Sequence, residues 1–172
     1  FQEMVQTVRG AEVTFVNFRF ERENFVSVYN NYRFHNQRQI TKSMLAWWAF
    51  QFDKQELLDL GCSFHIEHIY ARNRAEAQPS STIQQRIELL GNKSLLEQRI
   101  NIRASDYHFA DKAALYKGRQ TRKGKANGTR IYELLEMADR QTDFTEDDIV
   151  RRNERILNGF IDYLDRCGLL KG

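Results

Sequence analysis

The stretch CSFHIEHI, residues 62–69, alternates apolar and polar side chains with the two-residue period of a β-strand. On such a strand His65 and Glu67 share one face, and His68 comes next, at the strand end. A carboxylate beside an imidazole at a strand end is a common arrangement, so its meaning depends on the residues that come later in the chain.

The next segments complete a supersecondary pattern. Residues 71–81 are polar and contain the only proline, and residues 82–90 carry apolar side chains at helical spacing. Gly91 then supplies a C-terminal stop for that helix. Residues 93–96 fit a second short strand, and residues 105–116 fit a helix. The order is strand, long insertion, strand, helix.

Three further helices are expected around this pattern. Residues 37–52 carry large apolar side chains at spacings of three and four, and residues 131–140 and 145–166 do the same. The last of these begins with Thr145 followed by three acidic residues, as is typical of a helix N-terminus. Residues 13–20 fit either a strand or a helix. We therefore predict an α+β fold that is mainly α-helical.

Length and composition predict one soluble domain. The chain has 172 residues, is 41% hydrophobic and carries a net charge of +3, which permits a polyanionic partner without requiring one. The longest apolar stretch, residues 44–50, is far shorter than the roughly 20 residues that cross a membrane. Cys62 and Cys167 form no CxxC pair, which favours a reducing, cytoplasmic setting. Because the first residue is Phe, we expect a piece of a longer protein.

Four polar residues have the chemistry for phosphodiester hydrolysis. Glu67 offers the oxygen ligand that a hard divalent cation prefers, and a neutral His68 can take a proton from water near pH 7. Asn92 and Asn101 are nine positions apart. That spacing lets one asparagine brace the loop before the second strand while the other reaches a metal ion.

The order of these motifs resembles that of HNH nucleases. More narrowly, it resembles the C-terminal nuclease domain of GmrSD-type modification-dependent restriction enzymes, a domain also seen in phosphorothioation-linked defence nucleases. The resemblance covers roughly residues 37–165 and departs from the family at Ala71, where proline is common. It rests on Ile66-Glu67-His68-Ile69, Gly91-Asn92, Asn101, Phe109, Lys112 and Tyr116.

The resemblance implies a fold and a set of roles. It implies a single HNH-type domain over residues 1–172, built around a ββα-metal finger at about residues 62–116. Within the finger, Glu67 and Asn101 would ligate Mg²⁺ or Mn²⁺. His68 would be the general base, and Asn92 would orient the loop that carries it.

The resemblance also implies a biological role. We expect a metal-dependent DNA endonuclease or nickase, the effector of a phage-defence restriction protein whose N-terminal NTP-hydrolysing sensor domain is absent from this chain. Two alternatives stay open. One is a non-catalytic HNH-like module that binds nucleic acid without cutting it, and the other is RNA as the substrate.

Basic residues near the predicted site are expected to contact nucleic acid. The stretch KGRQTRKGKANGTR, residues 117–130, has six basic residues, three glycines and no acid, so we expect a flexible cationic loop. The loop can equally be a connector that does not contact nucleic acid. For His65, a hydrogen bond to a neighbouring residue is more common for a histidine on a strand than contact with a ligand. The expected nucleic-acid contacts are His65, Lys112, Lys117, Arg119, Arg122, Lys123 and Lys125.

Overall fold

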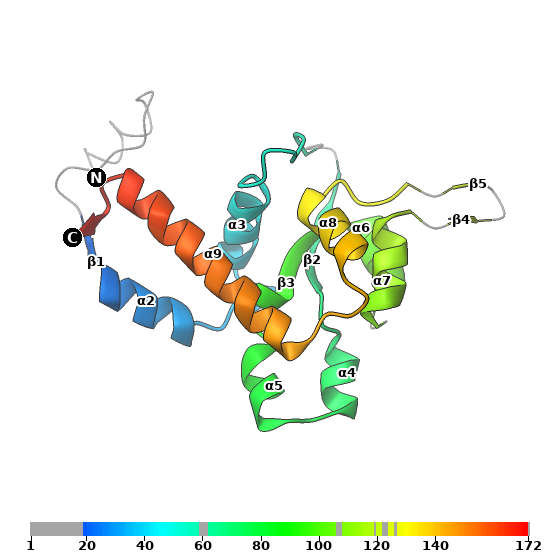
Figure 1. The fold of residues 1–172 in the computed structure, drawn as a ribbon, viewed down its shortest axis with the longest axis horizontal. Coiled ribbons are helices and arrows are strands. Elements are labelled where there is room, and N and C mark those ends of the chain that lie inside the picture. Colours follow the sequence, from blue (N-terminus) through cyan, green and yellow to red (C-terminus); the bar gives the residue numbers. More distant parts are fainter. Residues whose placement is uncertain are drawn as a thin grey trace. The chain divides into compact units, whose positions relative to one another are not determined.

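The computed structural model describes residues 19–58, 62–105, 108–118, 120–121, 124–125 and 127–171. The chain divides into two compact units (Figure 1). The smaller unit joins the segments Phe1–Tyr32 and Glu154–Gly172, and the larger one is Arg33–Asn153. The expectation of a single domain over residues 1–172 stays a prediction.

The smaller unit pairs both ends of the described chain. Strand β1 (Phe20–Glu21) lies parallel to β6 (Leu170–Lys171), and helix α2 (Arg22–Asn31) comes directly after β1. The C-terminal part of α9 (Glu146–Arg166) packs on α2 through Phe25 and Phe160, whose ring centroids are 5.6 Å apart. Only α9 was expected from the sequence pattern.

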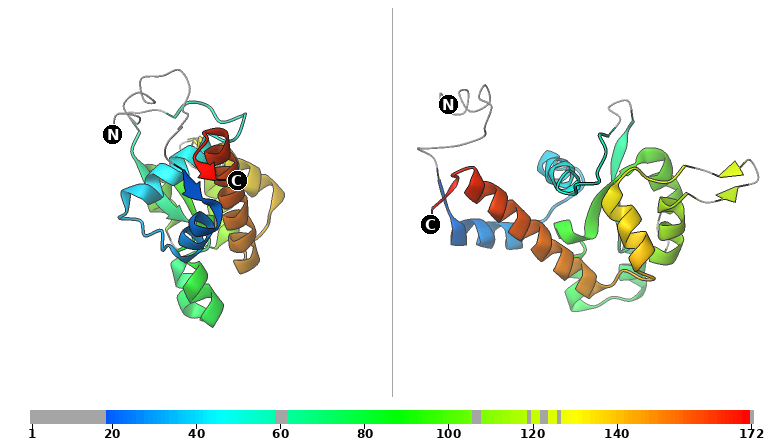
Figure 2. Two further views of the ribbon diagram at one scale, coloured as in Figure 1. Left: turned by 90° about the vertical axis from the view of Figure 1, so that its left-hand side faces the viewer. Right: turned by 45° about the horizontal axis from the view of Figure 1, so that its top comes forward.

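An antiparallel hairpin forms the centre of the larger unit (Figures 1 and 2). Strand β2 (Phe64–His68) pairs with β3 (Lys93–Glu97), so that His68 lies opposite Lys93. All five residues of β3 are buried. Strand β2 lies within the predicted stretch 62–69 and β3 extends the predicted stretch 93–96 by one residue, and together with the helices they confirm the α+β class.

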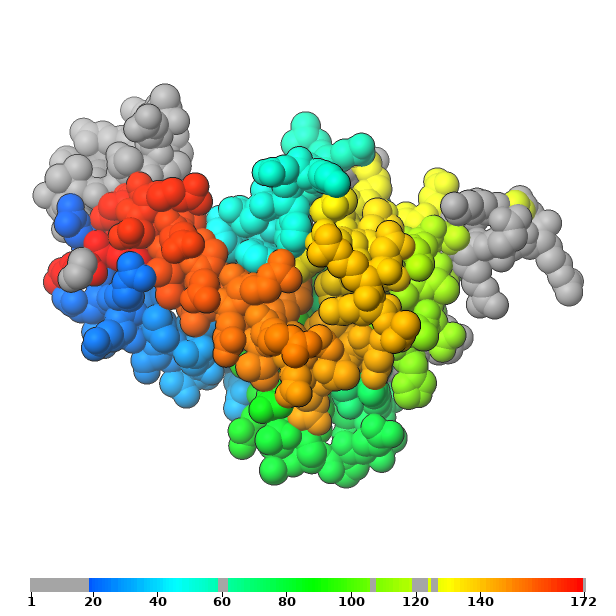
Figure 3. Space-filling view, viewed as in Figure 1, coloured from blue at the N-terminus to red at the C-terminus, as the bar shows by residue number. Residues whose placement is uncertain are grey.

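Helices cover the hairpin. Helix α3 (Gln39–Ala49) packs on β3, while α6 (Gln98–Ala104) contacts both strands and α7 (Phe109–Tyr116). Helix α8 (Tyr132–Arg140) packs on α7. In Figure 3 the side chains of α8 and of the start of α9, yellow to orange, cover part of the face that is turned to the viewer. The core includes Leu45, Ile69, Leu96, Phe109 and Leu134, each no more than 2% exposed.

The helix predicted over residues 105–116 is present as α7, although it begins only at Phe109, and α6 was not predicted. The chain turns into α6 immediately after β3, and α6 ends where Ser105 adopts a positive φ of 36°. Ser favours such interruptions because its side chain competes for backbone hydrogen bonds. Asn101 therefore lies within α6 rather than at the start of a longer helix.

The long insertion between the strands is partly helical. Its polar half contains an unexpected helix, α4 (Arg72–Ala77), and its second half forms α5 (Ser81–Arg86), shorter than predicted. Ser80 caps α5 by accepting a hydrogen bond from the Ile83 amide at 2.9 Å. The insertion thus carries its own short helices back to the start of β3.

Gly91 is needed for a close approach rather than for ending a helix. It lies in a 3₁₀ turn (Leu90–Asn92) that leads into β3. A Cβ at this position would overlap the Ile149 carbonyl and the Asn153 backbone on α9. Glycine therefore lets the turn that carries Asn92 press directly against that helix.

The basic loop contains two very short strands, β4 (Gln120–Thr121) and β5 (Gly124–Lys125), which pair antiparallel. Arg119, Arg122 and Lys123 lie outside the described residues, as does most of residues 13–20. Along the described part of the chain, no helix is long and apolar enough to span a membrane.

Candidate active site

A pocket of about 210 Å³ lies between β2, α6 and the buried face of α7. Three of the four residues selected from the sequence for chemistry line it, namely Glu67, His68 and Asn101. Folding therefore brings a carboxylate and an imidazole from β2 and an amide from α6 to one cavity. The lining is completed by Ile66, Arg72, Ser105 and Lys112.

Glu67 is buried and its charge is balanced inside the protein. Its Oε1 lies 2.7 Å from Lys112 Nζ and accepts a hydrogen bond from the Tyr116 hydroxyl at 3.1 Å. Burial, followed by the negative charge of Glu67, raises the pKa of Tyr116 well above its ordinary value. The Tyr116 hydroxyl therefore remains a donor that holds the carboxylate in one orientation.

Lys112 has a different position from the one expected of a nucleic-acid contact. Its side chain is 1% exposed, and its ammonium bridges Glu67 and the His68 carbonyl oxygen, 2.5 Å away. A buried and paired ammonium does not fit a role on an outer phosphate-binding surface. Lys112 instead belongs to the wall of the pocket and ties α7 to the end of β2.

Asn92 lies outside the pocket and braces the chain just after His68. It is fully buried. Its Oδ1 accepts the Tyr70 amide at 2.7 Å, and its Nδ2 donates to the carbonyl oxygens of Tyr70 at 3.2 Å and Ile87 at 3.1 Å. Its own carbonyl accepts the Ile69 amide at 2.9 Å. These bonds fix the two residues after His68 to the start of β3.

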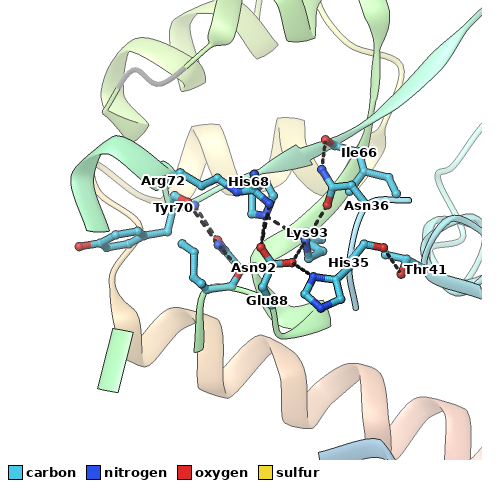
Figure 4. A network of polar contacts seen from close by, with 11 residues as sticks. His35, Asn36, Thr41, Ile66, His68, Tyr70, Arg72, Glu88, Asn92 and Lys93 are labelled. Atoms are coloured by element: carbon cyan, nitrogen blue, oxygen red, sulfur yellow. Dashed lines mark hydrogen bonds and ion pairs between the residues drawn. The ribbon is translucent and has the colours of Figure 1, made fainter. Parts of the chain in front are cut away.

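A polar cluster surrounds the outer edge of the His68 ring (Figure 4). His68 Nε2 lies 2.9 Å from Lys93 Nζ and 3.4 Å from Glu88 Oε1. Lys93 Nζ also donates to Glu88 Oε2 at 2.7 Å and to Asn36 Oδ1 at 2.6 Å. Lys93 is fully buried, so this ammonium is satisfied entirely by the protein.

Charges in the cluster set the protonation of His68. Burial lowers the pKa of His68, the hydrogen bond with Glu88 raises it, and the charges of Lys93 and Arg72 lower it again. The net shift is downward, so His68 is neutral near pH 7. A neutral imidazole can accept a proton, which is the property that a general base needs.

Glu88 is the anion at the centre of this cluster. Its Oε1 accepts a hydrogen bond from Arg72 Nη2 at 2.8 Å, and its Oε2 lies 3.5 Å from His35 Nδ1. Burial alone would raise its pKa, but the hydrogen bonds from His68 and Lys93 outweigh burial and hold the pKa far below the usual range. Glu88 therefore stays ionised at every pH at which the protein is expected to work.

Among the remaining expected nucleic-acid contacts, the two whose side chains are described, His65 and Lys117, do not line the pocket. His65 is half-buried on β2 opposite Leu96, outside the set of described residues that line the pocket. Lys117 Nζ donates to the Ala138 carbonyl at 3.0 Å and lies 3.5 Å from Asp139, so it is directed toward α8. Only the backbone of Lys125 is described. Contact between this loop and nucleic acid stays a prediction.

Comparison with known families agrees with this arrangement. Residues 17–158 match the model of a family described as GmrSD restriction endonucleases, C-terminal domain. The chain belongs to this family. Membership in the GmrSD C-terminal family implies a nuclease domain of a restriction endonuclease, with DNA as its substrate. No similar protein was found among curated sequences, and no solved structure was similar enough to count as a match.

The oxygen donors of the GmrSD C-terminal pocket suit only some cations. Within the described residues, no group of three or more His, Cys, Asp or Glu side chains is arranged to hold a metal ion. The described residues of the pocket therefore lack the set of three or four such ligands that zinc sites commonly use. Magnesium is commonly held by one or two protein oxygens plus water and substrate phosphate, so Glu67 and Asn101 fit it.

Three residues of the cluster were missed by sequence reasoning: Arg72, Glu88 and Lys93. Lys93 had a signal, because the hairpin register places it directly opposite His68. Glu88 and Arg72 had none, since they reach His68 only through the fold of the insertion. Asn101 makes no side-chain hydrogen bond to other described residues, which leaves its amide available to a ligand.

Proposed function

We propose that this GmrSD C-terminal domain is an HNH-type endonuclease or nickase that hydrolyses DNA phosphodiester bonds with Mg²⁺ or Mn²⁺. The observation that supports this most directly is the shared pocket of Glu67, His68 and Asn101. These are the carboxylate, base and amide that the chemistry requires, and they come from β2 and α6 in ββα order.

Each residue has a role that its position suggests. His68 removes a proton from the attacking water, since it is neutral and lines the pocket. Asn92 keeps His68 in place through the bonds to Tyr70. Glu67 and Asn101 hold the cation. Lys112, beside Glu67, adds a fixed positive charge to the wall near the scissile phosphate.

A bound divalent cation would stabilise the charge that develops on the phosphate oxygens and the leaving group. We further propose that the domain is the effector of a phage-defence protein whose NTP-hydrolysing sensor domain selects the target. This division of roles is consistent with the residues of the pocket. The described residues that line it can support phosphodiester hydrolysis, and we assign none of them to recognising the edges of bases.

The test is cleavage of a supercoiled plasmid with Mg²⁺ or Mn²⁺, with EDTA as the metal-free control. His68→Ala should lose about 10²–10⁴-fold in rate, the usual contribution of a general base. His108→Ala is the matched control, because His108 is exposed and lies outside the pocket. It should cut like the unsubstituted protein.

A non-catalytic module gives the opposite set of results. The pairing of Glu67 with Lys112 is the observation that favours it, because the ammonium competes with a cation for the carboxylate. That alternative predicts salt-sensitive DNA binding with no cleavage under any metal and no effect of EDTA. A plasmid that stays supercoiled throughout, or a His68→Ala variant as active as the parent, would rule out the nuclease.

A further inference from the structure

His68 Nε2 stands between a group that can only donate and a group that, when ionised, can only accept. The Lys93 ammonium is 2.9 Å away and has no lone pair, while the Glu88 carboxylate, 3.4 Å away, has no proton. Figure 4 shows both reaching the same edge of the ring. Nε2 can therefore form a hydrogen bond with only one of them at a time, either accepting from Lys93 or donating to Glu88. The two hydrogen bonds have different chemical consequences.

A neutral imidazole carries a single N–H, so the state of Nε2 fixes the state of Nδ1. If Nε2 accepts a hydrogen bond from the Lys93 ammonium, the ring proton is on Nδ1, and Nδ1 can then only donate. If Nε2–H donates to Glu88, Nδ1 keeps its lone pair. Since Nε2 is occupied by the cluster, only this second tautomer leaves His68 able to take a proton from water.

We propose that Glu88 is a positioning residue: it accepts the Nε2–H of His68 and so leaves Nδ1 as the basic nitrogen that faces the pocket. This inference rests on the proposed function of His68 as the base. Lys93 has the opposing influence on the tautomer, although it helps to hold Glu88. The chemistry of His68 thus depends on a balance between two buried neighbours.

The contacts of Glu88 favour this assignment. Arg72 binds Oε1 at 2.8 Å, and Lys93 binds Oε2 at 2.7 Å, so the carboxylate cannot turn and Oε1 stays directed at His68. Lys93 also retains two acceptors closer than His68, in Glu88 and Asn36. Releasing Nε2 therefore leaves the ammonium well bonded, and the donor tautomer of His68 costs the cluster little.

Glu88 also connects the base to the pocket wall. Arg72, which it binds, lines the same pocket as His68. One carboxylate from the insertion thus positions two pocket residues that lie four positions apart in the sequence. A residue that acts only in folding has no reason to contact both.

The first test compares two substitutions whose effects should differ in size. Glu88→Gln removes the acceptor charge and offers an N–H to Nε2, so kcat for plasmid cleavage should fall about 10²-fold or more with little change in KM. Lys93→Met removes the competing donor but also one of the two contacts that hold Glu88, so kcat per folded molecule should fall much less than in Glu88→Gln. If both variants lose kcat equally, Glu88 and Lys93 are merely structural and the proposal fails.

Glu133→Gln is the matched control. Glu133 is also buried and also bonded to an arginine and a second donor, but it does not contact His68. Its substitution should lower the melting temperature without the selective loss in kcat that we expect for Glu88→Gln. An equal loss in kcat would show that any broken buried network impairs cleavage, and would overturn the assignment.

A spectroscopic measurement separates this inference from the proposed function. In protein with ¹⁵N-labelled histidine, ring nitrogen shifts distinguish the two tautomers, and His68→Asn identifies the His68 signals among the four histidines. We expect the Nε2–H form in the parent and the Nδ1–H form in Glu88→Gln. This readout needs no activity, so an inactive protein with the Nε2–H form rules out the nuclease alone, and an Nδ1–H form in a parent that cleaves DNA rules out the positioning role alone.

Discussion

Two buried glutamates of the larger unit, Glu67 and Glu133, form ion pairs of equal length with basic side chains, but their surroundings differ. Glu67 is 2.7 Å from Lys112 and lines the pocket. Glu133 is 2.7 Å from Arg152 and accepts the Trp48 indole N–H at 2.9 Å, and it is not among the described residues that line that pocket. A buried ion pair by itself indicates neither stability nor function. The difference shows that access to a cavity is what makes one of them a candidate for chemistry.

The partners of these glutamates show the same contrast. Arg152 uses its remaining donors on backbone, joining α9 to the turn before β3. The acceptors are the carbonyl oxygens of Leu90, Gly91 and Lys93. Lys112 makes one such bond, to the His68 carbonyl, at the residue that carries the proposed base. The first pair holds the hairpin in place, and the second sets the wall of the pocket that the hairpin forms.

The largest expected effect is on catalysis, from Glu67→Gln. The change keeps the shape of the side chain and removes the charge that would hold a cation. A metal ion contributes several kcal/mol to transition-state stabilisation, so the cleavage rate should fall by about 10³-fold. Plasmid cleavage in Mg²⁺ measures this, and Glu133→Gln should retain its kcat per folded molecule. A Glu67→Gln variant whose cleavage rate is within tenfold of the parent's would contradict the difference between Glu67 and Glu133.

The second effect is on stability, from Arg152→Met. This substitution leaves Glu133 charged, buried and without its arginine, a change that typically costs about 3–5 kcal/mol. Urea unfolding measures the loss, and the variant's kcat, corrected for the folded fraction, should match the parent. A stable variant with impaired cleavage would mean that the Glu133 pair also belongs to the site.

The same contrast explains how far sequence reasoning reached. The alternation in residues 62–69 and the run at 93–96 are local signals, and both strands formed where they were expected. Glu67, His68 and Asn101 were selected for their side-chain chemistry and their order in the sequence, and the fold brings them to one pocket, while their roles stay predictions. Helix α6 was not predicted, and neither was its end at Ser105, where φ is positive.

Residues that act through others were the hardest to find. In the sequence, Glu88 does not differ from the other polar residues of the insertion. Its contact with His68 becomes visible only in the folded structure. Lys112 was expected to contact nucleic acid, but its side chain is buried, which is rare for lysine, and is paired with Glu67. Long-range pairing of charges leaves no periodic trace in a sequence, so no local pattern predicts it.

A smaller effect concerns how stability depends on pH, and it adds Glu88 to the comparison of buried glutamates. Its pKa in the folded protein lies below the ordinary value of 4.5, so ionised Glu88 stabilises the fold above about pH 4.5 and that stabilisation is lost as pH falls further. His68, whose pKa is also lowered from 6.5, acts in the same direction. Stability should therefore decline on acidification from pH 7 to pH 4.

The check is urea unfolding at several pH values for the parent and for Glu88→Gln. The variant lacks the titrating carboxylate, so its free energy of unfolding should fall less steeply with acid than that of the parent. Equal slopes would mean that Glu88 is not strongly coupled to its cationic neighbours in solution.

The smallest expected effect is a gain in stability from Ala71→Pro. Ala71, three residues after His68, precedes α4 with φ of −66° and ψ of 140°, and proline fixes φ near −65°. The backbone thus already has the conformation that the family's usual proline would impose. Restricting the unfolded chain should add about 0.4–1 kcal/mol to the free energy of unfolding.

Cleavage should be unchanged, because Asn92 already holds the neighbouring Tyr70 by two hydrogen bonds. Destabilisation would show that the buried Ala71 site has no room for the ring, and a gain in kcat would show that Asn92 alone leaves His68 too loosely held.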